Sequence, residues 1–239
     1  PVARAIVRGA KPTTVTVQGC GTVVLNRDEG SYARVAYDAS AHAAIVRDFA
    51  SLALTDQLGT LGDDFALAKG GNQRLDRYFA DVGAIEPGAN PLLWQTLAGQ
   101  LSDLGGRLPK GAAKTAMRAR IVTTLAPALE RVGFQAKQDE SPLISTLRET
   151  LIAVLGDNGD PVVAEKARRY VAALATDTNA IPAAIRQPIL GTYAKLIDNL
   201  RDVNDGAAML LGSSMDSLRA ASILKNLRTL HIRIKQHSC

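Results

Sequence analysis

From Asp38 onward, apolar residues recur at spacings of three and four, which is the period of an amphipathic helix. Helix-start residues, several of them followed by proline, divide this pattern into segments of about ten to twenty residues. The predicted starts are Asp38 or Ser40, Thr55, Asn72, Asn90, Gly111, Ser141, Asp160, Gln187, Asn204 and Ser214. Gly70 and Gly71 are expected to end the second helix.

Because the connections between these segments are short, consecutive helices are expected to pair antiparallel and to stack on their neighbours. The predicted fold class is mainly α: an irregular α-solenoid-like array of the HEAT or armadillo kind. No strict repeat length runs through the chain, which disfavours a regular tetratricopeptide or ankyrin array.

The first 38 residues have a different period. Residues 13–17, 22–25 and 32–37 are β-branched or alternating runs separated by glycine-rich or polar turns, and they predict three short antiparallel strands. Three strands are too few to be stable alone, so we expect them to pack on the helices or to belong to a larger sandwich. The predicted domains are therefore residues 1–38, a remnant of a small β-sandwich, and residues 39–239, a helical domain.

Composition supports a soluble helical protein. Apolar residues make up 46% of the 239 residues but aromatic residues only 4%, so the core is expected to be aliphatic. No apolar run is long enough to cross a bilayer, and no secretory signal opens the chain. The compartment stays open between cytoplasm and periplasm of a bacterium. The start at Pro1 suggests a piece of a longer protein, and Cys20 and Cys239 predict no disulfide framework.

Candidate chemistry is sparse. The three histidines, His42, His231 and His237, form no His-Glu-x-x-His zinc motif, and no Gly-x-Ser-x-Gly turn or phosphate-binding loop occurs. His42 is expected to be a surface or partly packed residue in the first turn of a helix. We predict no catalytic, cofactor-binding or metal-binding residue in this chain.

Three aspartates, Asp56, Asp63 and Asp64, invite a metal or acid–base interpretation. Acidic side chains in the first turns of a helix complement its dipole, and neighbouring residues point in different directions. We therefore expect these aspartates to have a structural role.

The net charge of +5 is concentrated at the C-terminal end. No acidic residue follows Asp216, and the basic residues there are Arg219, Lys225, Arg228, Arg233 and Lys235. Basic groups favour a helix C-terminus, and aromatic platforms for single-stranded nucleic acid are missing. Nucleic-acid binding is thus a minor alternative.

The segment before the first helix resembles a family signature. Zinc aminopeptidases of the aminopeptidase N and puromycin-sensitive type carry Gly-aromatic-aromatic-Arg-Val-x-Tyr-Asp before their helical domain. This chain keeps Tyr32, Arg34, Val35, Tyr37 and Asp38 of that signature, with Ser31 and Ala33 as departures. The likeness continues through Asp56-Gln57-Leu58-Gly59 and Trp94 and is specific over about residues 26–108. The segment from Leu230 to Cys239 does not resemble the family's closing helices.

The resemblance implies a noncatalytic C-terminal helical region, truncated at both ends, that covers the active-site chamber of a zinc aminopeptidase and limits substrate access. Zinc would lie in the parent's catalytic domain, which is the expected partner together with peptide substrates. The chain alone would be inactive. The five signature residues would join the domains, with Arg34 paired to an acidic group or helix-end carbonyls. A self-standing helical scaffold that binds another protein is the main alternative.

Overall fold

A computed structural model describes residues 2–6, 12–19 and 21–211, with side chains up to residue 199. These residues form eight α-helices and no strand, which confirms the prediction of a mainly helical array. The helices are α1 (Ala39–Asp48), α2 (Leu54–Lys69), α3 (Leu75–Ala84), α4 (Pro91–Arg107), α5 (Ala112–Val132), α6 (Pro142–Asp157), α7 (Pro161–Ala173) and α8 (Ala183–Leu211). Two 3-10 turns, η1 (Arg27–Glu29) and η2 (Phe49–Ser51), flank α1.

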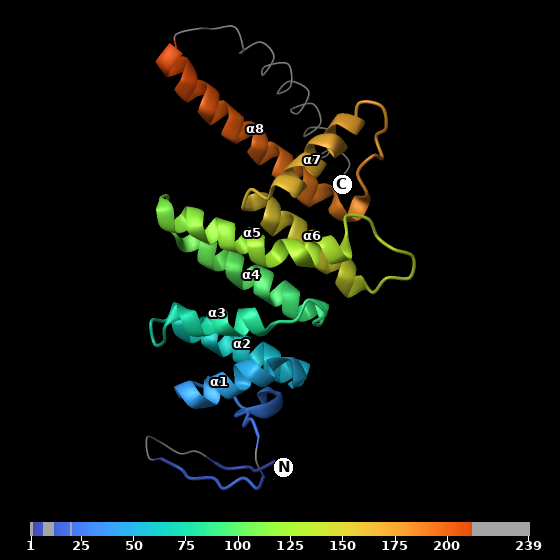
Figure 1. The fold of residues 1–239 in the computed structure, drawn as a ribbon. Coiled ribbons are helices and arrows are strands. Elements are labelled where there is room, and N and C mark those ends of the chain that lie inside the picture. The colour runs from blue at the N-terminus through green and yellow to red at the C-terminus, as the bar shows by residue number, and fades with distance from the viewer. Residues whose placement is uncertain (1, 7–11, 20, 212–239) are drawn as a thin grey trace.

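The helices stack along one long axis (Figure 1). Helices α1, α2 and α3 lie at the end nearest the N-terminal segment, α4 and α5 lie in the middle, and α6, α7 and α8 lie at the far end. Helix α4 contacts α2, α5 and α6, and α8 packs on α6 and α7. Each helix thus buries its apolar face against neighbours close in sequence, as expected for a helical array.

Side-chain caps account for four of the predicted helix starts. Asp38, Asn90, Ser141 and Asp160 each accept a hydrogen bond from a backbone N–H in the first turn of α1, α4, α6 and α7. In α4, α6 and α7 a proline follows the cap directly. Proline has no N–H, and an N–H at the first helical position would have no partner within the helix. These starts are confirmed.

Two other predicted caps are wrong. Helix α2 begins at Leu54 without a side-chain cap, and the Thr55 hydroxyl donates instead to the Asp28 carboxylate at 3.3 Å. The Asn72 N–H bonds back to the Leu67 carbonyl, so Asn72 completes the turn that ends α2. Thr55 makes a tertiary contact and Asn72 completes a glycine turn, so neither residue caps the helix that its local propensity predicted.

The predicted starts at Gln187 and Asn204 are also wrong, because both residues lie inside α8. Pro188 removes one backbone hydrogen bond from that helix. Ile185 and Ile189, on either side of it, are almost fully buried against neighbouring helices. Continuous burial on one face outweighs the lost bond. The predicted start at Ser214 lies outside the described residues.

The core is mainly aliphatic, as composition predicted, although Phe49 and Tyr78 are also almost fully buried. Leucine and isoleucine from α2, α4, α5 and α6 are fully buried, among them Leu61, Leu97, Leu101, Ile121, Leu125 and Leu151. Trp94 lies at the edge of this core with 8% of its surface exposed. Glycine allows α6 and α8 to approach closely: a Cβ added at Gly156 of α6 would overlap the Thr192 side chain of α8.

The three short strands predicted before residue 38 are not found in the described part of that segment. Figure 1 shows an extended chain there, below α1. The apolar side chains of the predicted strands, such as Val15, Val23 and Leu25, are 44–54% exposed. A strand that neither buries one face nor pairs along its edge has little to stabilise it. The assignment of residues 1–38 to a β-sandwich stays a prediction.

None of the helices in the described residues combines the length and the apolar composition needed to cross a membrane.

Candidate functional site

The signature segment is joined to α2 by one carboxylate. Asp63 accepts a hydrogen bond from Arg34 Nη1 at 3.0 Å through Oδ1 and from the Val35 N–H at 2.9 Å through Oδ2. Arg34 also lies 3.4 Å from the Gly62 carbonyl oxygen. The Asp63 side chain is only 8% exposed, whereas Arg34 is 60% exposed. The predicted pairing of Arg34 with an acidic group is confirmed.

The other signature residues alternate in exposure. Val35 and Tyr37 are half-buried, while Tyr32 projects fully into solvent. The Tyr37 hydroxyl accepts a hydrogen bond from the Leu25 N–H at 2.9 Å, and burial raises its pKa although this bond acts in the opposite direction. The hydrogen bond from the Ala41 N–H lowers the pKa of Asp38, the α1 cap. The Tyr37 contact ties two parts of the N-terminal stretch together, and the Asp38 contact fixes the start of α1.

Asp56 and Asp63 anchor the chain that precedes α1 at two places, the turn at Asp28 and the signature segment. Asp56, in the first turn of α2, accepts from the Asp28 N–H at 2.8 Å, and Asp63 follows two turns later. The helix-dipole interpretation fits Asp56, but it is wrong for Asp63 and Asp64, which lie in the second half of α2. Their different directions are confirmed, because Asp63 faces Arg34 and Asp64 faces His42.

A buried cluster lies on the other side of α2. His42 of α1 places Nε2 at 2.9 Å from Asp81 Oδ1 of α3 and at 2.9 Å from Asp64 Oδ2 of α2. The side chains of His42, Asp64 and Asp81 are 8%, 2% and 0% exposed. The expectation of a surface or partly packed His42 is therefore wrong: its spacing to Ile45 and Phe49 places it on the buried face of α1.

Asp81 was not predicted from the sequence as a candidate residue. Burial, followed by the negative charge of Asp64, raises the pKa of Asp81 to about 9. Burial also lowers the pKa of His42, the Asp64 charge acts against this, and the charge of Arg77 adds to the lowering. At neutral pH Asp81 therefore keeps a proton that a solvent-exposed aspartate would lose. One signal was present: Asp81 follows Tyr78 by three residues on the buried face of α3.

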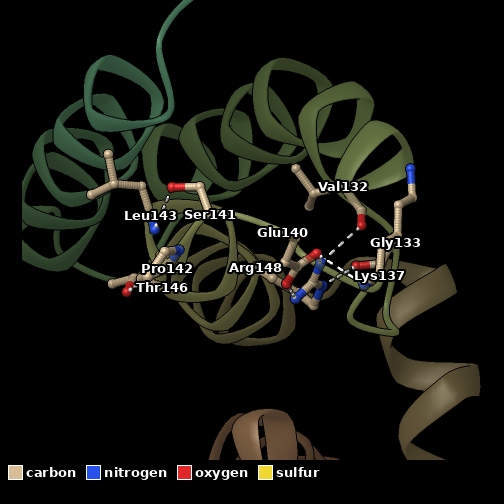
Figure 2. Close-up of polar contacts among 9 residues, drawn as sticks. All are labelled: Val132, Gly133, Lys137, Glu140, Ser141, Pro142, Leu143, Thr146 and Arg148. Carbon is tan, nitrogen blue, oxygen red and sulfur yellow. Dashed lines mark hydrogen bonds and ion pairs between the residues drawn. The ribbon is translucent and has the colours of Figure 1, made fainter.

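A third polar contact closes the loop between α5 and α6, and Figure 2 shows it. Arg148 of α6 is 1% exposed and pairs with both Glu140 oxygens at 2.6 Å. Its Nε donates to the Gly133 carbonyl at 2.8 Å and its Nη2 to the Val132 carbonyl at 3.2 Å. Arg148 thus satisfies carbonyls at the end of α5 and holds the loop that follows. This role of Arg148 was not predicted from the sequence.

Replacing Asp63 with asparagine is expected to loosen the signature segment while α1 and α2 stay folded. The asparagine amide lacks the charge of the carboxylate, and its NH2 group faces one of the two donors, Arg34 or the Val35 N–H. The lost contacts destabilise the attachment of the segment by about 1–2 kcal/mol. Hydrogen exchange at the Val35 amide should become about tenfold faster. Mass spectrometry of peptides that cover residues 31–38 would measure it.

Asp76→Asn is the matched control, because Asp76 forms an exposed pair with Arg74 on α3. It should leave exchange at Val35 unchanged. Equal exchange at Val35 in the Asp63→Asn variant and the native chain would show that Asp63 does not anchor the segment.

Comparison with known proteins gives a family for the whole arrangement. The family model described as ERAP1-like C-terminal domain matches residues 22–219, which include the signature segment, the buried cluster and all eight described helices. No curated protein matches the chain in a sequence search. The match covers most of the chain, and the chain belongs to the ERAP1-like C-terminal domain family, the helical C-terminal domain of M1 aminopeptidase-like proteins.

Proposed function

We propose that this chain is the noncatalytic helical region of a zinc-dependent aminopeptidase. In the intact enzyme it covers the active-site chamber and limits which peptides reach the zinc. The zinc, the residues that bind the substrate amine and the catalytic base belong to the catalytic domain of the same polypeptide, which is the partner of this region. Peptides are its substrates.

The attachment of the signature segment to α2 carries this proposal. A wall that limits access must keep a fixed position relative to the domain that holds the reaction centre. The Asp63 carboxylate fixes Arg34 and the Val35 backbone at once, and Asp56 fixes the turn at Asp28. Hydrogen bonds to a charged group are among the stronger polar contacts in proteins. They provide a defined joint between the preceding segment and the helical array.

The family match supports the same proposal independently of these contacts. It includes the joint and the array in one continuous span. The sequence holds no His-Glu-x-x-His pair, so the zinc of an aminopeptidase would need ligands from another part of the polypeptide.

The encoded residues upstream of Pro1 test the assignment directly. The proposal requires a His-Glu-x-x-His motif there, followed by a glutamate on the next helix. An upstream sequence without this motif would contradict the proposal and favour the self-standing scaffold.

The isolated chain is expected to release no detectable product from aminoacyl chromogenic substrates in the presence of zinc. Hydrolysis requires a metal-bound water that the substrate can reach, together with a base beside it. Product release over time, measured with the full-length enzyme as positive control, would check this. Turnover that follows the chain through purification and disappears with a chelator would contradict the noncatalytic role.

A further inference from the structure

The buried cluster of His42, Asp64 and Asp81 brings together one imidazole nitrogen and two carboxylates from three different helices. Their ligand atoms all lie within 4.8 Å of one another. The hydrogen on His42 Nε2 can be donated to only one carboxylate, so with the bond to Asp81 made, only the proton held by Asp81 is left for Asp64 Oδ2. Asp81 Oδ2 is buried and without a partner as well. Such oxygens at the centre of a core are costly unless something positive binds them.

The geometry suits a small divalent cation. Zinc binds histidine nitrogen and carboxylate oxygen at about 2.0–2.2 Å, so neighbouring ligand atoms in a tetrahedral site are about 3.3–3.6 Å apart. The two measured separations from His42 Nε2 are 2.9 Å. Rotamer adjustments of a few tenths of an ångström would open the cluster to that size. The ion would displace the proton that Asp81 otherwise keeps at neutral pH, and the two carboxylates would then balance the charge of a divalent ion.

We propose that His42, Asp64 and Asp81 bind one Zn²⁺ ion between α1, α2 and α3. The ion is structural, since all three ligands are buried beneath the helices and a substrate cannot reach them. It fixes the three helices nearest the signature segment. Asp64 is the sequence neighbour of Asp63, so the same stretch of α2 holds the ion on one side and Arg34 on the other. This site is separate from the catalytic zinc of the proposed function.

Arg77 sets a limit on the affinity. It lies one helical turn before Asp81 on α3, and its charge acts on both His42 and Asp81. A cation in the cluster is repelled by this guanidinium. We therefore expect a dissociation constant in the micromolar range, weaker than the tightest structural zinc sites.

Titration calorimetry on the chelator-treated chain tests the site with Zn²⁺ as the probe. We expect one ion per chain with a Kd below about 10 µM and a higher Tm in zinc than in chelator. The His231→Ala/His237→Ala double variant removes the other two imidazoles of the chain and should bind with unchanged affinity. Absence of binding to the native chain would overturn the proposal.

His42→Ala, Asp64→Asn and Asp81→Asn should each weaken Zn²⁺ binding at least about 100-fold, with circular dichroism as the check of folding. The Asp76→Asn variant should bind as the native chain does. If His42→Ala does not fold, Zn²⁺ binding by the two conservative aspartate variants tests the site instead. Binding that survives in any folded variant of the three, or that is lost in the double histidine variant, would place the ion elsewhere and would refute this site.

Discussion

Replacing Arg148 with alanine is expected to lower the free energy of unfolding by about 3–5 kcal/mol, the range for removing one partner of a buried ion pair. The variant leaves the Glu140 carboxylate without its partner and the carbonyls of Val132 and Gly133 without a donor. Urea denaturation followed by circular dichroism would measure the loss.

The matched control is Arg169→Ala. Arg169 is 74% exposed and pairs with Glu165 one turn away on α7. An exposed pair of this kind contributes about 0.3–0.5 kcal/mol. A similarly small loss for Arg148→Ala would mean that Arg148 does not hold the α5–α6 loop.

Acid pH should act on the same contact. Hydrogen bonds from Arg148 lower the pKa of Glu140 to about 2 from its usual value near 4.5. The folded state thus binds fewer protons than the unfolded state between these two pH values. The contribution of the pair is complete above about pH 4.5 and is lost as pH falls toward 2. Glu140→Gln should therefore reduce the difference in stability between pH 6 and pH 3.

Replacing Leu97 with alanine should have an effect of comparable size, about 2–5 kcal/mol. Leu97 is fully buried on α4, the helix that contacts α2, α5 and α6. The cavity would lie where the two ends of the array meet, so both ends lose packing. The unfolding midpoint in urea would report the loss.

Leu92, on the same helix, is 39% exposed and provides the control. Leu92→Ala removes the same atoms from a half-exposed position and should cost clearly less than Leu97→Ala. Equal losses in the two variants would show that α4 does not form the centre of the core.

The predicted elements that proved right depend on short-range chemistry. Asn90, Ser141 and Asp160 each stand before a proline, and this local combination specifies a helix start without information from the rest of the chain. The Arg34 contact could be predicted because Arg34 stands in the family signature at the junction with the helices, although its partner, Asp63, could not be named.

The misses depend on contacts between residues distant in sequence. The length of α8 follows from packing on α6 and α7, which overrides the proline at position 188. His42 and Asp81 are 39 residues apart, and although helical spacing places each on a buried face, nothing local in the sequence pairs them. Arg148 stands beside Leu147 and before Leu151, and only the carbonyls of α5 explain a cation there. The predicted basic C-terminal tail lies outside the described residues.

Peptide-length selectivity of the full-length enzyme tests whether the helical region limits access to the active site. We would compare kcat/KM for an aminoacyl amide with kcat/KM for a ten-residue peptide in the native, Asp63→Asn and Asp76→Asn proteins. If the helical region limits access, loosening its joint should raise the ratio of long-peptide to amide cleavage at least about threefold in Asp63→Asn alone. An unchanged ratio in Asp63→Asn, with faster exchange at Val35 proving that the joint is loose, would contradict the account.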